Sequence, residues 1–152
     1  MSPKKLVVGC DHGGFRLKQR LIPFLKKKGF SVKDVGTFSQ ESMDYPDTAY
    51  KVARSISKHK EGRGLLICKS GIGNCIVANK VRGVRAALCY NAKAARLSRQ
   101  HNDANVLVLG SLFVNEDRAK KIIDVWLKTP FERGRHLRRV RKIERIERLC
   151  AR

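Results

Sequence analysis

The sequence predicts an α/β fold: a doubly wound five-stranded parallel sheet, as in a Rossmann-like three-layer sandwich, with a basic C-terminal helix. Two observations lead to this prediction. Short runs rich in Val, Ile and Leu recur along the chain, and amphipathic segments with helical spacing separate them. Strands that alternate with helices form right-handed crossovers, so the strands become parallel and helices cover both faces of the sheet.

The individual elements follow from these patterns. Five apolar runs have the composition of strands covered on both faces, and they lie at residues 6–9, 31–35, 65–68, 84–89 and 106–109. Five segments have helical spacing, and they lie at residues 14–28, 45–59, 73–80, 91–100 and 115–128. Thr129-Pro130 ends the fifth of these helices.

The tail, residues 132–152, carries nine Lys or Arg residues against three Glu. Its apolar residues recur at every third position: Leu137, Val140, Ile143, Ile146 and Leu149. This pattern predicts a basic helix that packs its apolar stripe on the body or on a second subunit. The alternative interpretation is an arm that binds nucleic acid.

Length and composition limit the class of protein. A chain of 152 residues fits one domain, 1–152, with the tail as a helix at a subunit interface. The longest uncharged stretch, residues 104–115, is 12 residues long, whereas a membrane span needs about 18 to 20 apolar residues. The N-terminus has no secretory apolar region, so we expect a cytoplasmic protein. The five cysteines lack CxxC spacing, which favours reduced thiols over a disulfide frame or a zinc knuckle.

The net charge of +21 comes from 34 Lys and Arg residues against 13 Asp and Glu residues. Such a field attracts phosphorylated metabolites, RNA and DNA alike. Charge alone therefore makes nucleic acid a possible partner, but no motif for one is present.

Two loops follow strands at the edge of the sheet where ligands of such folds bind. After the third strand, residues 70–73 (SGIG) form either an anion cradle of backbone N–H groups or a tight turn without a ligand. Cys68, just before this loop, is either a thiol whose pKa is lowered by the helix dipole and Lys69 or a small buried apolar residue. After the first strand, Asp11 and His12 either enter a pocket or decorate the surface.

Two further groups lie elsewhere. His101, Asn102 and Asp103 precede the fifth strand. His101 is either a general acid or base, or the three residues form a cap for the turn before that strand. They lie at the opposite end of the sheet from Cys68, unless they are displaced or serve a neighbouring subunit. Arg135, His136, Arg138 and Arg139 follow Gly134, and a guanidinium fork suits a phosphate, although a solvated helix face would also carry some of these residues. A thiol, an anion cradle, an imidazole and arginines are the set that isomerisation of a sugar phosphate requires, without a metal motif or a nucleotide fingerprint.

The chain resembles the type B ribose-5-phosphate isomerases, whose relatives isomerise galactose 6-phosphate and allose 6-phosphate. The resemblance spans nearly the whole chain and rests on GCDHGG (9–14), DYPD (44–47), LLIC with SGIG (65–73), ANK (78–80), LSRQHNDANVLVLGS (97–111) and GRHLRRV (134–140). It implies interconversion of ribose 5-phosphate and ribulose 5-phosphate through a cis-enediolate, in the non-oxidative pentose phosphate pathway and without a cofactor or a metal. There are two alternatives. The chain isomerises a six-carbon sugar phosphate, allose or galactose 6-phosphate, or it is an altered isomerase that binds RNA or other polyanions.

By position, the resemblance implies that Cys68 moves the proton, His101 opens the sugar ring and Ser70 assists. The implied substrate-binding residues are Asp11, His12, Tyr45, Lys69, Gly71, Ile72, Gly73, Asn102, Arg135 and Arg139. The family forms dimers or tetramers with shared active sites, which would resolve the position of His101. This chain departs from the family at Lys69, usually Gly, and at Leu112, usually Arg. We hypothesise that Lys69 partly replaces that arginine or lowers the pKa of Cys68.

Overall fold

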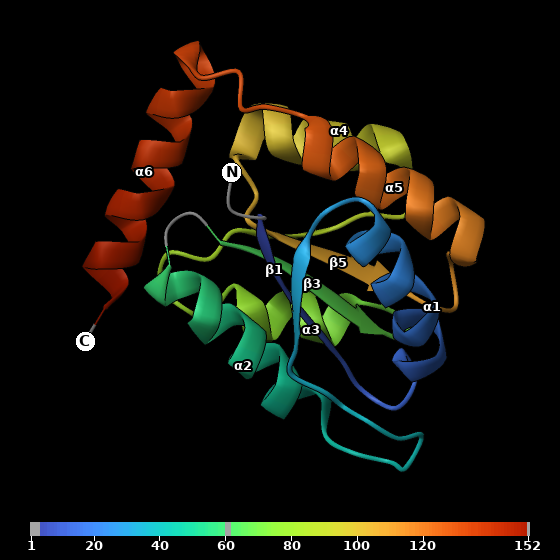
Figure 1. The fold of residues 1–152 in the computed structure, drawn as a ribbon. Helices are drawn as coiled ribbons and strands as arrows, with labels where there is room; N and C mark the ends of the chain where they lie inside the picture. Colours follow the sequence, from blue (N-terminus) through green and yellow to red (C-terminus); the bar gives the residue numbers. More distant parts are fainter. Residues whose placement is uncertain (1–3, 60–61, 152) are drawn as a thin grey trace.

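The fold is a five-stranded sheet with helices on both faces (Figure 1). The structure is a computed structural model that describes residues 4–59 and 62–151. The parallel strands are β1 (Lys5–Cys10), β2 (Ser31–Asp34), β3 (Arg63–Cys68), β4 (Ala86–Leu88) and β5 (Val106–Gly110), in the spatial order β2-β1-β3-β5-β4. The helices are α1 (Phe15–Lys27), α2 (Tyr45–Lys58), α3 (Ile72–Ala78), α4 (Ala92–Asn102), α5 (Glu116–Lys128) and α6 (Gly134–Cys150). The predicted fold class and the alternation of elements are confirmed.

Two apolar cores lie on opposite faces of the sheet, because side chains of a strand alternate between its faces. In β1, Leu6 and Val8 join the core under α1, α4 and α5, whereas Val7 joins the core under α2 and α3. The central strands β1, β3 and β5 are therefore buried on both sides, as expected for such apolar runs. No helix in the described ranges is long and apolar enough to cross a membrane.

The expectation that all five strands are fully buried is wrong for β2 and β4. Both are edge strands, so each pairs with one neighbour, and Ser31 and Lys33 of β2 are exposed. The three residues of β4 are half-buried. A charged residue on an edge strand also discourages pairing with another chain.

The strand order changes direction between β1 and β3. From β1 the chain crosses to β2 on one side, and from β3 it crosses to β4 and β5 on the other. The loops after β1 and β3 consequently separate at the carboxyl ends of two adjacent strands, where such sheets have their ligand crevice.

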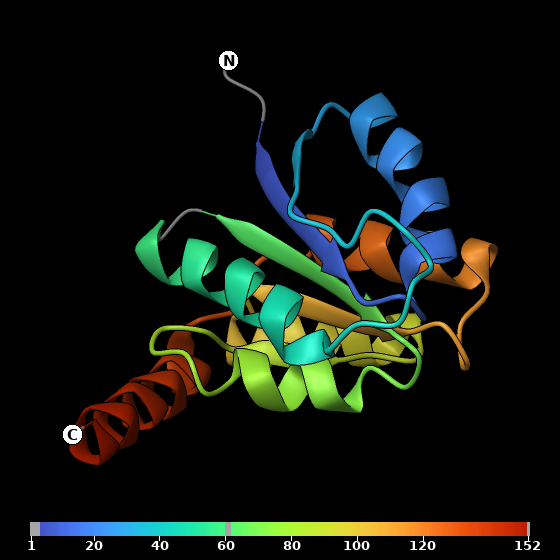
Figure 2. The same ribbon diagram turned by 90° about the horizontal axis from the view of Figure 1, so that it is seen from below.

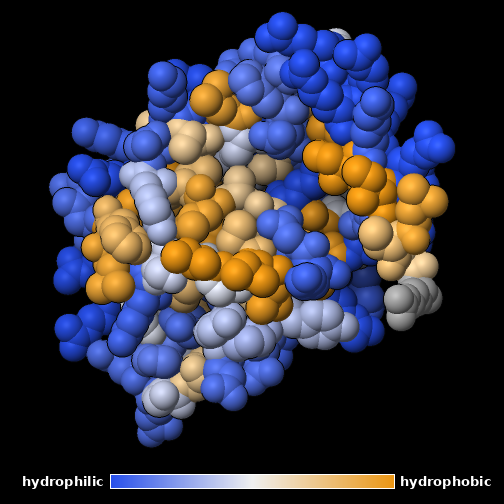
Figure 3. All heavy atoms as spheres, turned by 180° about the vertical axis from the view of Figure 1, so that it is seen from behind, coloured by the Kyte–Doolittle hydropathy of each residue, from blue (hydrophilic) through white to orange (hydrophobic). Residues whose placement is uncertain are grey.

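Helix α6 extends away from the body, as two perpendicular views show (Figures 1 and 2). Its buried residues are His136 and Val140. Ile143, Ile146 and Leu149 are 46%, 59% and 74% exposed, so most of the predicted stripe does not pack on its own body. Apolar surface along this helix and across the adjoining face is visible from behind (Figure 3). Among the described residues, Ile143, Ile146 and Leu149 thus remain largely uncovered by the body.

Candidate active site

Residues after β1 and β3 form the first part of the site, which we call the cysteine cluster: Asp11, His12, Tyr45, Cys68 and the loop 69–73. Cys68 is the last residue of β3 and is 5% exposed. The backbone N–H of Gly71 donates to its Sγ at 3.1 Å. Gly71 has a φ of +83°, a left-handed conformation that glycine adopts without strain, and this turn directs the N–H back toward the sulfur.

Burial raises the pKa of the Cys68 thiol above its ordinary value. Backbone N–H groups of Asn74, Gly71 and Ser70 act in the opposite direction, and the charge of Asp11 adds to the increase. The expectation of a lowered pKa is therefore wrong for the isolated chain, because loss of hydration outweighs the N–H groups. Lys69 is not among the causes, so the hypothesis that it lowers the pKa is not supported either.

The loop 69–73 is held by hydrogen bonds and by close packing. Ser70 Oγ accepts from the N–H of Ile72 at 3.2 Å, and the carbonyl of Ser70 accepts from the hydroxyl of Tyr90 at 3.0 Å. Gly110 of β5 packs against that same carbonyl so closely that a Cβ at residue 110 would collide with it. The loop is thus held from both sides in a fixed conformation.

Asp11 and His12 are each oriented by a backbone N–H. The buried Asp11 accepts from the N–H of Gly14 at 3.1 Å through Oδ1. His12 accepts from the N–H of Met43 at 3.2 Å through Nδ1. Since Nδ1 carries the lone pair, the proton of the neutral ring lies on Nε2, which can donate to a ligand.

Tyr45 and Lys69 border the same loops. Tyr45 begins α2, and a Cβ built on Gly73 would lie 2.6 Å from its ring. The side chain of Lys69 is exposed and lies over Gly13 of the other loop. The structure therefore brings these residues to the edge of the sheet where Cys68 lies.

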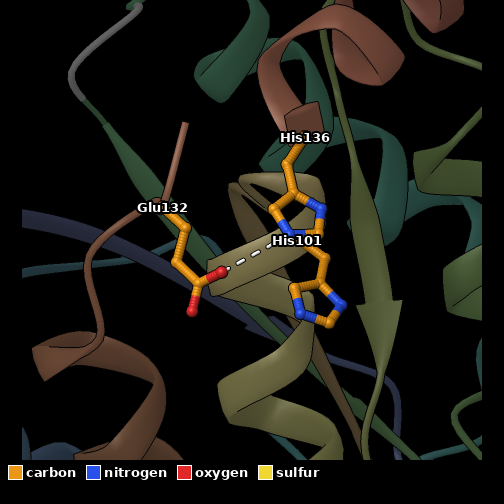
Figure 4. A group of neighbouring side chains, drawn as sticks. All are labelled: His101, Glu132 and His136. Atoms are coloured by element: carbon orange, nitrogen blue, oxygen red, sulfur yellow. Dashed lines mark ion pairs between the residues drawn. The ribbon is translucent and has the colours of Figure 1, made fainter. Parts of the chain in front are cut away.

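A second group, the histidine cluster, lies where α4 ends and α6 begins: His101, Asn102, Glu132, His136 and the arginines beside them. The rings of His101 and His136 stack, with centroids 4.2 Å apart and planes 8° apart. Glu132 Oε2 lies 3.4 Å from Nε2 of His136, and Figure 4 shows the three side chains together.

The local sequence explains how these two segments meet. The N–H of Glu132 donates to the carbonyl of Gln100 at 3.1 Å, which joins the α5–α6 connection to the end of α4. Asp103 is the C-cap of α4 and has a left-handed backbone conformation, and its carboxylate forms ion pairs with both Arg85 and Arg99. These contacts fix the last turn of α4, which carries His101.

His101, Glu132 and His136 are the described residues with the spacing of a metal site, since their donor atoms lie within 4.8 Å of one another. A metal bound by an imidazole lies in the plane of that ring, however, and two nearly parallel stacked rings do not share such a point. One ring must rotate before the three residues can hold an ion.

Positive charge surrounds the histidine cluster. Burial lowers the pKa of His136, and the neighbouring His101, Arg135 and Arg139 lower it further, although Glu132 opposes them. The first turn of α6 has no acidic residue to offset the positive end of the helix. Arg135 and Arg139 are both exposed there, so this end of the molecule suits an anion.

The cysteine cluster and the histidine cluster lie at opposite ends of the sheet. Cys68 is level with Gly110, the last residue of β5, whereas His101 precedes the first residue of that strand. Five residues of strand span about 13 Å, so one chain does not bring Cys68 and His101 together.

Sequence reasoning missed two supporting residues. Glu132 was not considered as a partner of His136, and no local pattern indicates that pair. Ser111 was not predicted to support the site, yet its Oγ donates to the carbonyl of Gly13 at 2.8 Å and its N–H donates to the carbonyl of Cys68. Its position directly after a central strand was the signal available.

Comparisons with known proteins agree on one family. The family model described as Ribose/Galactose Isomerase matches residues 6–143. Ribose-5-phosphate isomerase B of Escherichia coli (strain K12) is 46% identical over 144 residues, which cover 95% of this chain and 97% of that protein. The solved structure of Clostridium thermocellum ribose-5-phosphate isomerase B has a TM-score of 0.95 and 50% identity, covering 97% of this chain and 99% of the other. The solved structure of Mycoplasma genitalium ribose-5-phosphate isomerase B with bound ribulose-5-phosphate has a TM-score of 0.93 and 45% identity, covering 95% of this chain and 96% of the other.

Proposed function

The chain belongs to the ribose/galactose isomerase family, and from this membership we propose that it is an aldose–ketose isomerase that interconverts ribose 5-phosphate and ribulose 5-phosphate. The observation that carries the proposal is Cys68, a buried sulfur at the ligand-binding edge of the sheet that accepts an N–H from Gly71. Relatives at 45 to 50% identity that cover nearly the whole chain support the same substrate.

In the proposed reaction, the Cys68 thiolate removes the proton from C2 of the open-chain aldose. The electron pair of that bond forms the C1–C2 double bond of a cis-enediolate, and the negative charge moves to O1. Returning the proton to C1 and moving the O2 proton to O1 gives the ketose, so no redox partner is consumed. Ser70 assists the transfer between the two oxygens, and the amides of residues 69–73 stabilise the enediolate.

The furanose ring must open first, and we assign this step to His101. The imidazole takes the proton of the O1 hydroxyl and supplies one to the ring oxygen. Asp11, Tyr45 and the Nε2–H of His12 contact the sugar, and Asn102 binds a hydroxyl. Lys69 contributes a cation beside these groups.

We assign the phosphate to Arg135 and Arg139 in the first two turns of α6. A guanidinium binds phosphate through two parallel hydrogen bonds, and the uncompensated positive end of the helix adds to the attraction. Both arginines lie with His101 in the histidine cluster, so the proposed reaction needs both clusters at one substrate.

A homodimer with shared sites satisfies this need, and we propose that the active protein is one. In a two-fold dimer the same surface patch of each subunit meets its copy, so the histidine cluster of one subunit completes the cysteine cluster of the other. The exposed apolar stripe of α6 supports such an interface. The five unpaired cysteines support the cytoplasm, where thiols stay reduced, as its compartment.

The test is conversion of ribose 5-phosphate to ribulose 5-phosphate by the purified protein, with allose 6-phosphate and galactose 6-phosphate assayed in parallel. We expect kcat/KM to be highest for the pentose phosphate. A higher kcat/KM for a hexose phosphate would contradict the proposed substrate, and no turnover of any of the three would contradict the isomerase.

A further inference from the structure

Helix α6 carries five exposed cations on one side, which we call the basic lane: Arg138, Arg141, Lys142, Arg145 and Arg148. They recur at helical positions i, i+3, i+4, i+7 and i+10, which confines them to about 120° of the helix circumference and spreads them over about 15 Å. Together with Gly134 and Leu137, these five residues line a shallow surface hollow.

The basic lane has no acidic counterpart. Among the described residues, none of its five cations lies within 4.0 Å of a carboxylate. The two acidic residues of α6 face the body instead: Glu144 pairs with Arg85 at 3.7 Å, and Glu147 accepts the N–H of Gly83 at 2.7 Å. All the positive charge of the lane is therefore available to an outside anion.

The lane is separate from the residues assigned to the substrate. Arg135 and Arg139 lie on another side of α6, roughly 100° from the centre of the lane, together with Ile143 and Ile146. The buried His136 and Val140 lie on nearly the opposite side, against the body. The proposed reaction therefore does not use the basic lane. Of the exposed apolar residues that support the dimer interface, Ile143 and Ile146 lie outside the lane, whereas Leu149, near the end of α6, lies within it.

We propose that the basic lane binds double-helical DNA through its phosphate backbone, without reading the base sequence. Duplex DNA displays one negative charge per about 1.7 Å of its axis, and four of the five cations are arginines, whose fork suits a phosphate. An α-helix fits the B-form major groove, about 12 Å wide, and the lane lies on the outward side of α6, whereas the major groove of duplex RNA is too narrow.

Two other occupants fit less well. The lane carries no aromatic side chain, and proteins that hold single strands stack bases on such side chains. A helix lying on a lipid surface needs a free apolar side opposite its cations. Here His136 and Val140 on that side are buried against the body and Glu147 accepts a hydrogen bond from Gly83, which leaves Ile143 as the exposed large apolar residue there.

The test uses the full chain and a labelled 20-base-pair DNA duplex, with binding followed by fluorescence anisotropy over a range of salt concentrations. The variant is R141Q/K142Q/R145Q. Its control is K26Q/K27Q/K121Q, which removes the same charge from exposed, unpaired lysines of α1 and α5. We expect the lane variant to lose about tenfold more affinity than the control at 0.1 M salt. Its slope of log K against log salt falls by about 2.7, since each lost phosphate contact removes about 0.9.

Isomerase activity and elution volume of the lane variant stay at the wild-type values, because its three residues lie outside the proposed active site. Absence of duplex binding by the wild type at 0.1 M salt would overturn the proposal, as would an equal loss of affinity in the control. Duplex RNA or vesicles of anionic lipid that bind as tightly as DNA would overturn the assignment to DNA. Loss of isomerase activity has no bearing on these outcomes, so the two proposals fail separately.

Discussion

The cysteine cluster and the histidine cluster differ in how they are built. Backbone groups form most of the first: an N–H of Gly71 faces the sulfur, and N–H groups of Gly14 and Met43 orient Asp11 and His12. Side chains form the second, at the ends of two helices that meet through the stacking of His101 on His136.

The two clusters also differ in what they lack. The cysteine cluster has a thiol and a carboxylate, but it lacks the arginines assigned to the phosphate, and in the single chain the pKa of its thiol is raised. The histidine cluster has imidazoles, a carboxylate and guanidiniums but lacks the loop of backbone N–H groups beside Cys68 that would stabilise an enediolate. Each cluster thus holds part of an acid/base site, which is why we place the complete site between two subunits. The following experiments test this division.

Cys68→Ala should have the largest effect. Loss of a general base typically costs 10² to 10⁴ in rate, and we expect kcat to fall by about 10³ or more, with little change in oligomeric state. Cys75→Ala is the matched control, since that half-buried thiol lies on α3 outside the cluster. Equal activity of the two variants would remove Cys68 from the mechanism.

Mixing two inactive variants tests whether sites are shared. In a dimer of one Cys68→Ala chain and one His101→Ala chain, one site carries both substitutions and the other carries neither. After the subunits are exchanged at random, half of the dimers are mixed, so about a quarter of wild-type activity should return. Activity that stays at the level of the separate variants, once native mass spectrometry has detected mixed dimers, would argue against shared sites.

His101→Ala separates ring opening from proton transfer. We expect a loss of about 10² in kcat/KM for ribose 5-phosphate, because an acid/base group is removed. Erythrose 4-phosphate cannot form a furanose ring, since its C4 hydroxyl carries the phosphate, so any turnover of it should be nearly unaffected. The exposed His59→Ala serves as a control. A similar loss with both sugars would contradict the ring-opening role.

Lys69→Gly tests whether this lysine compensates for Leu112 in the cysteine cluster. Exposed charge contacts contribute up to about 1 kcal/mol, so we expect KM to rise about fivefold with a small change in kcat. Lys69→Arg should retain the wild-type KM. Unchanged or improved KM and kcat in the glycine variant would leave Lys69 without this role.

The smallest predicted effect is on the pH dependence of alkylation of Cys68 by iodoacetamide. The thiolate is the reacting form, so a raised pKa means that less of the sulfur is ionised at pH 7 than in free cysteine. Peptide mass spectrometry should give a rate at Cys68 that increases with pH and reaches half its maximum at a pH above the ordinary cysteine pKa. A rate already constant between pH 6 and 8 would mean that the thiol is fully ionised there and would contradict the raised pKa.

Much of the architecture was predictable because its signals are local. Alternating apolar runs and amphipathic segments gave the order of strands and helices, and the rule for ligand sites in parallel sheets gave the loops after β1 and β3. The prediction for β4 failed because its local sequence is as apolar as that of a central strand, and only the spatial order β2-β1-β3-β5-β4 places it at the edge. For β2, in contrast, Lys33 and Asp34 were a local signal of an exposed strand.

The sequence by itself determined the elements, their parallel arrangement and the end of the sheet at which Cys68 lies. Tertiary structure decided that the Cys68 pKa is raised, that His101 stacks on His136, and that the α6 stripe is exposed. The physical reason is that periodicity is a property of neighbouring residues in the chain. Desolvation, charge interactions and stacking depend instead on segments that meet only after folding.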